Sequence, residues 1–223
     1  MKPADLTRRA VAEGLGTALL LATVVGSGIM GDRLSGGNVA IALLANTLAT
    51  GAGLVALILT FGPISGAHFN PVVTVMAAVK GDAPSREVVP YVVAQVIGAF
   101  AGVALAHVMF GEPVYGVSTH VRSGVGQAVA EATATFGLLA VIQSVGKYRP
   151  TAGPFAVGAY ITAAYWFTAS TSFANPAVTL ARAATRTFAG IRPADVPMFI
   201  GAQCVGAALS IVVFSWLLRG DDR

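Results

Sequence analysis

The sequence predicts an all-α membrane protein of one domain, residues 1–223, with six transmembrane helices and two half-helices in inverted repeats. Three observations lead to this prediction. Hydrophobic residues make up 55% of the chain and charged residues only 11%, whereas charged residues make up about a quarter of a soluble domain. Six apolar stretches are long enough to cross about 30 Å of hydrocarbon as helices. An Asn-Pro pair also occurs twice, each time before an apolar run too short to cross.

Each of the six apolar stretches holds roughly 20 residues, the length that a membrane-spanning helix needs. The first lacks the small-residue cleavage site of a signal peptide, so we expect it to be retained. A cleaved signal is the alternative. The predicted spans are Ala10–Met30, Asn38–Phe61, Glu87–Phe110, Gln127–Val145, Gly153–Ala169 and Ala194–Leu218.

The basic residues predict which way the chain crosses the membrane, because lysine and arginine accumulate on the cytoplasmic side. Nine of them fall on one side of the predicted spans and five on the other. We therefore expect a multi-pass protein of the inner (plasma) membrane with both termini in the cytoplasm, and no nucleic-acid partner. The inner residues are Lys2, Arg8, Arg9, Lys80, Arg86, Lys147, Arg149, Arg219 and Arg223, and the outer ones are Arg33, Arg122, Arg182, Arg186 and Arg192.

Three short segments recur in the same order in the two halves of the chain. "AVAE" at Ala10 returns at Ala128, the Asn-Pro segment at Asn70 returns at Asn175, and "AQVIGA" at Ala94 returns as "AQCVGA". We infer a duplication, with repeat 1 at about 1–110 and repeat 2 at about 125–223. Each repeat holds three spans, an odd number, so the second must enter the bilayer from the opposite side.

The two Asn-Pro segments predict half-helices over Asn70–Val79 and Asn175–Ala184, each about 15 Å long. Inversion brings them in from opposite faces, so their first residues meet at the membrane centre. Proline suits the first helical position and asparagine is a good N-cap. Each Asn is expected to cap with its oxygen and to turn its amide into the lumen. The residues expected at the pore midplane are Asn70, Pro71, Val72, Asn175, Pro176 and Ala177.

The chemistry of that meeting point follows from the helix ends. Two helix N-termini carry partial positive charge and face each other. Irregular backbone at this depth is tolerated only where it lines a wet cavity or is buried in protein. Such a centre offers hydrogen bonds to neutral solutes and opposes the passage of cations and protons.

Two glutamates inside the predicted spans and one histidine before the first half-helix are candidates for a role at the pore. Acids within spans are functional candidates by default, so Glu13 and Glu131 are either proton relays or acceptors for the irregular chain before each half-helix. Their symmetric placement favours the second, loop-supporting role. His68 ties its loop or gates the cytoplasmic vestibule. The sequence holds no catalytic residue pattern, metal cluster or cofactor motif, and its single cysteine, Cys204, excludes an intramolecular disulfide.

The segments "SGAHFNPVVT" at Ser65–Thr74 and "FANPAVTLAR" at Phe173–Arg182 resemble the two signature loops of the aquaporin, or major intrinsic protein, family. Gln95 and Gln203, like the two glutamates, fall where this family places them. The resemblance implies six tilted helices, two half-helices, one pore per subunit, a homotetramer and a passive channel for small neutral solutes.

Two positions depart from the family's usual pattern. Val72 replaces the alanine of the first Asn-Pro-Ala motif, and Val178 replaces the arginine that most members carry in the outer selectivity filter. Matching the family's other filter positions gives Thr50, Ser172 and either Tyr165 or Ala163, of which we prefer Tyr165 because helix register is less elastic than a loop.

The expected filter of Thr50, Tyr165, Ser172 and Val178 has no fixed cation. Without arginine the constriction should be wider and neutral, unless Arg182 reoccupies the space. We expect Arg182 instead at the outer end of the half-helix, facing protein or lipid headgroups.

The segment Ala163–Arg182, with valine at the filter position, resembles a bacterial subgroup of the family that is associated with arsenic. This resemblance implies passage of metalloid acids or methylated arsenicals, polyols and water. The alternatives are an ion-coupled secondary transporter with inverted repeats and an ordinary water-selective aquaporin.

Overall fold

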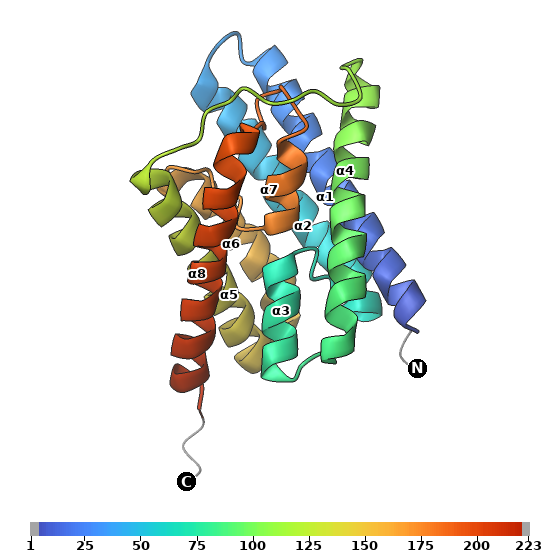
Figure 1. Ribbon diagram of the computed structural model, residues 1–223, viewed down its shortest axis with the longest axis vertical. Helices are drawn as coiled ribbons and strands as arrows, with labels where there is room; N and C mark the ends of the chain where they lie inside the picture. Colours follow the sequence, from blue (N-terminus) through green and yellow to red (C-terminus); the bar gives the residue numbers. More distant parts are fainter. Residues whose placement is uncertain (1–4, 220–223) are drawn as a thin grey trace.

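The computed structural model describes residues 5–219, which fold into eight α-helices joined by loops and three one-turn 3₁₀ segments. Six helices form a bundle and two short ones lie within it (Figure 1). This confirms the predicted class of six spanning helices plus two half-helices. The six are α1 (Leu6–Leu34), α2 (Val39–Ser65), α4 (Val88–Phe110), α5 (Val125–Tyr148), α6 (Gly153–Phe167) and α8 (Val196–Leu217), and the half-helices are α3 (Pro71–Lys80) and α7 (Pro176–Arg182).

The helices begin and end a few residues away from the predicted bounds. Helix α2 continues through Pro63 to Ser65, beyond the expected end at Phe61. Helix α7 has only 7 residues and ends at Arg182. Its length is therefore about 10 Å.

Helix α6 is also short, with 15 residues. Its length of about 22 Å is less than the thickness of the hydrocarbon layer. The chain after α6 continues as irregular backbone that leads into α7.

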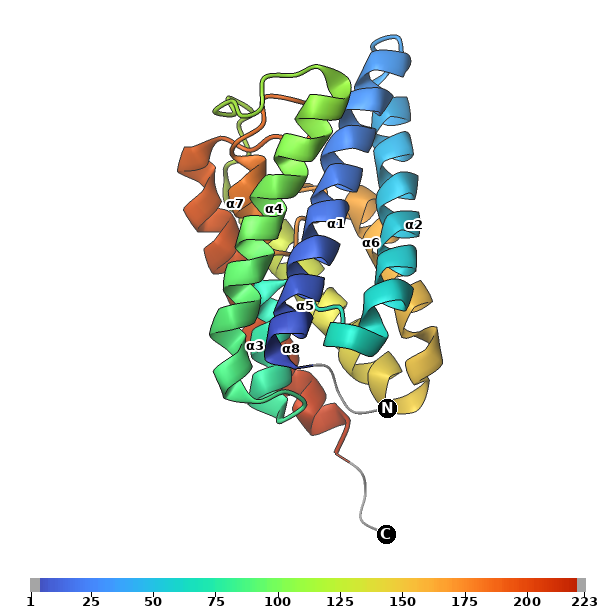
Figure 2. The same ribbon diagram turned by 90° about the vertical axis from the view of Figure 1, so that its right-hand side faces the viewer.

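Helix packing follows the same plan in both halves of the chain. Helix α1 makes its most extensive contacts with α4, and α5 with α8 (Figures 1 and 2). Helix α1 also packs on α2, as α5 does on α6. The half-helices lie end to end inside this frame. Corresponding elements of the two proposed repeats therefore pack alike.

Two glycines of the repeated "AQVIGA" and "AQCVGA" segments allow the closest of these contacts. A Cβ atom on Gly98 of α4 would lie 2.1 Å from the carbonyl oxygen of Gly14 on α1. A Cβ atom on Gly206 of α8 would lie 2.2 Å from the carbonyl oxygen of Ala132 on α5. Small residues let helix backbones approach closely in membranes, where dispersion contacts replace the hydrophobic effect between helices.

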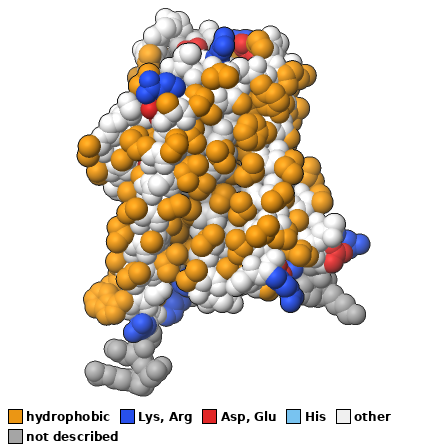
Figure 3. Space-filling view, viewed as in Figure 1, with side chains coloured by type: hydrophobic (Ala, Val, Ile, Leu, Met, Phe, Trp, Pro, Cys, Tyr) orange, Lys and Arg blue, Asp and Glu red, His pale blue; other side chains and the backbone are white. Residues whose placement is uncertain are grey.

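Large hydrophobic side chains are exposed along the outside of the bundle, including Leu48, Val93, Ile97 and Val212. On the face that Figure 3 shows, hydrophobic side chains cover the middle, and charged side chains gather at the two ends. This distribution fits a surface that faces lipid.

The start of α1 and the end of α8 lie at the same end of the bundle (Figures 1 and 2). Of the basic residues that predicted the orientation, Lys2 and Arg223 fall outside the described residues.

The close helix contact predicts that Gly206→Ala destabilises the fold. The added methyl must displace the α5 backbone, and overpacking of this kind costs about 1–3 kcal/mol. Gly201→Ala on the same helix is the control, since its Cβ would meet nothing within 4 Å. We expect thermal unfolding in detergent to show Tm lowered by several degrees for Gly206→Ala only. Equal melting of both variants would contradict the packing argument.

Candidate functional site

The half-helices α3 and α7 are joined at their N-termini by a reciprocal pair of hydrogen bonds. The side-chain amide of Asn70 donates to the carbonyl oxygen of Ala174 at 2.8 Å. The side-chain amide of Asn175 donates to the carbonyl oxygen of Phe69, also at 2.8 Å. Each asparagine thus fixes the loop that precedes the other, and the expected meeting of the two segments is present.

Both asparagines also cap their own helices. The Asn70 oxygen accepts from the backbone N–H of Val72, and the Asn175 oxygen accepts from those of Ala177 and Val178. Capping by the oxygen is as expected, but the amides are not wholly turned into the lumen. Each amide donates one of its two hydrogens to the loop before the opposite half-helix. Both asparagines also lie on the wall of a cavity.

The loops that lead into α3 and α7 hold backbone conformations that L-residues avoid. Ala67, Phe69, Thr171, Ser172 and Ala174 all have φ between 48° and 60°. Left-handed non-glycine residues cost of order 1–3 kcal/mol each and persist only where the surroundings determine them. Here two buried glutamates, one for each loop, bind the backbone and hold it in place.

Glu13 of α1 binds the first loop. Its carboxylate accepts the backbone N–H groups of His68 at 2.9 Å and Phe69 at 2.7 Å. It also accepts the Ser65 hydroxyl at 2.7 Å and the Gln95 amide at 2.8 Å. Four charge-assisted hydrogen bonds satisfy this carboxylate, which is fully buried.

Glu131 of α5 binds the second loop in the same way. It accepts the backbone N–H groups of Phe173 and Ala174, both at 2.9 Å, and the Gln203 amide at 2.6 Å. Gln203 continues to the Thr179 hydroxyl of α7 at 2.8 Å. These contacts are those of a loop support, and they occupy the oxygens that a proton relay would use.

His68 lies beside the first support. Its Nδ1 is 3.1 Å from the Thr74 hydroxyl, and its ring packs against Tyr91 with 5.4 Å between the ring centroids. It also lies on the cavity wall. The structure therefore links this side chain to α3 and leaves it in reach of a passing solute.

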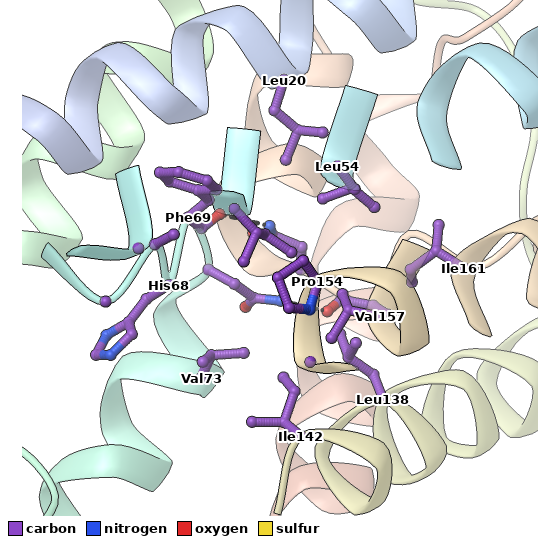
Figure 4. Close-up of a pocket in the computed structure, with 18 of the residues that line it drawn as sticks. Leu20, Leu54, His68, Phe69, Val73, Leu138, Ile142, Pro154, Val157 and Ile161 are labelled. Carbon is purple, nitrogen blue, oxygen red and sulfur yellow. Dashed lines mark hydrogen bonds between the residues drawn. The ribbon is translucent and has the colours of Figure 1, made fainter. Parts of the chain in front are cut away.

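A cavity of about 620 Å³ passes between the two half-helices and the surrounding helices. Its wall on one side is apolar, as Figure 4 shows for the side chains that converge on it. Both half-helix asparagines line it at the point where the helices meet. The labelled apolar residues are Leu20, Leu54, Phe69, Val73, Leu138, Ile142, Pro154, Val157 and Ile161.

The other four residues expected at the midplane follow the two asparagines directly but do not line the cavity. Val72 and Ala177 are buried in the hydrophobic core, and Pro71 and Pro176 are likewise not among the residues that line the cavity. The valine in place of alanine in the first motif therefore changes core packing behind the asparagine and not the wall of the cavity.

The four residues expected in the filter all line the cavity. The Tyr165 hydroxyl donates to the Thr50 hydroxyl at 3.4 Å, joining α6 to α2. The Ser172 hydroxyl is buried without a hydrogen-bond partner in the described part of the chain. Val178 contributes an apolar surface. Ala163, the alternative to Tyr165, is exposed and is not among the lining residues.

Arg182 ends α7 and contacts protein at Phe173 and Ala189, as expected. It also lines the same cavity, which was not expected, and it is 2% exposed. Its place on the cavity side agrees with its spacing of seven residues from Asn175 and four from Val178. Residues four apart share a helix face, so Arg182 follows Val178 on one side of α7. Arg122, in the loop before α5, is the other residue that the motifs missed, and it has no helical periodicity that would have indicated its position.

Comparison with known proteins agrees with this architecture. A family model described as "Major intrinsic protein" matches residues 1–172. The chain is 55% identical over 219 residues to the aquaglyceroporin AqpS of Rhizobium meliloti, covering 98% of this chain and 94% of that protein. It is 30% identical to the probable aquaporin AqpM of Archaeoglobus fulgidus, over 96% of this chain and 98% of that protein.

A solved structure, that of the aquaglyceroporin from Plasmodium falciparum, matches with a TM-score of 0.73, covering 96% of this chain and 95% of that chain. At 21% identity this likeness shows the fold alone. The chain belongs to the major intrinsic protein family. It is a membrane channel of that family and not an enzyme.

The contacts of Glu131 predict that Glu131→Gln weakens the fold and abolishes solute flux. The two backbone N–H groups bond different carboxylate oxygens. The amide nitrogen of glutamine cannot accept one of them, which costs about 1–3 kcal/mol. Thermal unfolding and vesicle flux would be measured together. Glu112→Gln, at a surface ion pair with Arg33, is the control and should change little. A variant with normal Tm and an altered pH dependence of flux would instead support a proton relay.

Proposed function

We propose that this channel passes small neutral solutes that carry several hydroxyl groups: polyols such as glycerol, undissociated metalloid acids or methylated arsenicals, and water. The observation that carries the proposal is Val178 on the cavity wall, at the family's filter position for arginine, with three hydroxyl-bearing residues around the same section. Those residues are Thr50, Tyr165 and Ser172.

The size of the opening supports this solute class. An arginine at position 178 would fill space with a long side chain and donate hydrogen bonds from a fixed charge. Valine leaves that volume to the solute. The cavity also has a long apolar side, formed by residues such as Leu54 and Ile161, against which the carbon or metalloid skeleton of a solute can lie while its hydroxyls bond elsewhere.

The hydrogen-bonding groups support hydroxylated solutes over purely apolar ones. Burying a hydroxyl group without a hydrogen-bond partner costs free energy. A solute hydroxyl that bonds to the Ser172 hydroxyl therefore lowers the free energy of the bound state. Thr50 and Tyr165 bond each other at a long distance of 3.4 Å, a contact that a solute can replace. A metalloid acid that is undissociated at neutral pH offers three hydroxyls on one small centre, as glycerol does on a short chain.

The relative named an aquaglyceroporin, at 55% identity across nearly the whole chain, supports the same class. We also place the protein in a bacterial inner membrane, with both termini in the cytoplasm and four copies per assembly. The excess of basic residues on one side supports the orientation, and the exposed apolar helix faces supply surface for both lipid and neighbouring copies.

One observation favours a second candidate, an ordinary water-selective pore. Tyr165 and Thr50 meet across the outer section, and Arg182 lines the same cavity, so together they are able to narrow the path. Ion-coupled transport has less support, because the carboxylates of Glu13 and Glu131 bind backbone N–H groups and leave the asparagines as the polar groups of the midplane.

Restoring the arginine separates the two candidates. For Val178→Arg in proteoliposomes we expect glycerol flux and arsenous acid uptake to fall by roughly tenfold or more while water flux changes much less, because the narrower filter still admits water. Stopped-flow light scattering measures water and glycerol, and total arsenic in collected vesicles measures the metalloid. Val178→Ala, which adds no charge at position 178 and keeps the filter open, is the control. Water-only flux in the unmodified protein would contradict the proposed solute class.

A further inference from the structure

The cavity has valine at position 178, but an arginine lines it one helical turn further along α7. Arg182 follows Val178 by four residues, about 6 Å along the axis of α7. Side chains on a helix lean toward its N-terminus, so the guanidinium of Arg182 reaches back toward Val178. Both residues line the cavity.

A second arginine shares its support. The guanidinium carbon of Arg182 is 3.4 Å from the centroid of the Phe173 ring, and that of Arg122 is 5.0 Å from the same centroid. Phe173 directly follows Ser172, which lines the cavity. Cation–π contact with one ring thus gathers two positive charges at the filter section.

Backbone carbonyls hold both guanidiniums in place. Arg182 donates from Nε to the carbonyl oxygen of Ala189. Arg122 donates from Nε to the carbonyl oxygen of Gly190 at 2.9 Å and from Nη1 to that of Ser170 at 3.2 Å. The neighbouring carbonyls of Ala189 and Gly190 thus fix one arginine each. Without such hydrogen bonds a long cationic side chain would sample many positions, and its charge would have no fixed place relative to the cavity.

Neither charge is neutralised by an ion pair in the described part of the chain. The ion pairs within residues 5–219 involve Arg8, Arg9, Arg33 and Arg192, and in none of them is Arg122 or Arg182 a partner. Arg122 is 8% exposed and Arg182 2%, and arginines so deeply buried are usually paired. Arg182 lies on the cavity wall and Arg122 lies behind it, on the same Phe173 ring. The buried carboxylate of Glu131 acts on both guanidiniums, and two cations beside one carboxylate leave a net positive potential in the adjoining lumen.

The charge on Arg122 persists at physiological pH. Burial lowers the pKa of its guanidinium to about 10, which is still well above neutrality. The Asp195 carboxylate accepts the backbone N–H of Arg122 at 2.8 Å. The Arg122 guanidinium itself forms no ion pair within residues 5–219.

We propose that Arg122 and Arg182, stacked on Phe173, form the cation barrier of this channel in place of the arginine that Val178 lacks. The filter then divides two tasks that a single arginine otherwise combines. Val178 sets the width, and the pair of arginines behind and beyond it sets the charge. A neutral solute passes the widened section, whereas a cation of the same size is repelled. This inference rests on the proposed function only in needing a pore wide enough for such solutes.

Urea and guanidinium test the barrier, because the two are planar, similar in size and rich in hydrogen-bond donors, and differ in charge. Uptake of each radiolabelled solute into proteoliposomes is measured with the membrane potential clamped at zero by potassium and valinomycin. In the unmodified protein we expect urea to enter at least about tenfold faster than guanidinium. Equal rates would overturn the proposal without any variant.

Variants then assign the barrier to the two arginines. In Arg182→Gln and Arg122→Gln the guanidinium-to-urea ratio should rise at least about fivefold, since one of two charges is lost. Arg182→Lys keeps the charge and should keep the low ratio. A ratio unchanged in both glutamine variants, with folded protein shown by size-exclusion chromatography, would overturn the proposal.

A different result identifies a failure of the proposed function instead. If the unmodified protein passes water and excludes both urea and guanidinium, the solute class is wrong. The barrier is then measured as proton leak with an enclosed pH-sensitive dye. A higher leak in Arg182→Gln than in Arg182→Lys would support the arginine barrier, and equal leaks would overturn it.

Discussion

The crossed hydrogen bonds between Asn70 and Ala174 and between Asn175 and Phe69 are the contacts on which the channel centre depends. They place two helix N-termini face to face and hold two strained loops open at membrane depth. The glutamates on α1 and α5 bind those loops from behind. The six surrounding helices have apolar outer faces for lipid and close glycine contacts that hold the frame together.

Helix α7 carries several of the features on which the two proposals rest. Its N-cap is the asparagine at the midplane, and its first turn presents Val178 to the cavity. Its last residue, Arg182, turns a buried charge to the same side. A helix of 7 residues thus carries the centre of the pore, the wide position of the proposed filter and half of the proposed cation barrier.

Much of the fold was predictable because its signals are local. Apolar runs of sufficient length indicate spans, and an N-cap followed by proline indicates where a half-helix begins. The hydrogen bonds of the asparagine amides were not predictable, since their acceptors lie about a hundred residues away. Arg182 stands seven residues after Asn175 and four after Val178, and both spacings put it on the same side of α7 as these two residues. Arg122 lies in a loop, where no periodicity relates sequence to position.

The crossed bonds also set an order for assembly of the nascent chain. They join residues separated by 104 and 106 positions, so the loop before α3 has no partner for its asparagine until residue 174 has been synthesised and inserted. Contacts of such long sequence separation form late. Until then the amide of Asn70 lacks the acceptor that it has in the folded protein, and the centre of the pore forms only when both halves of the chain are present.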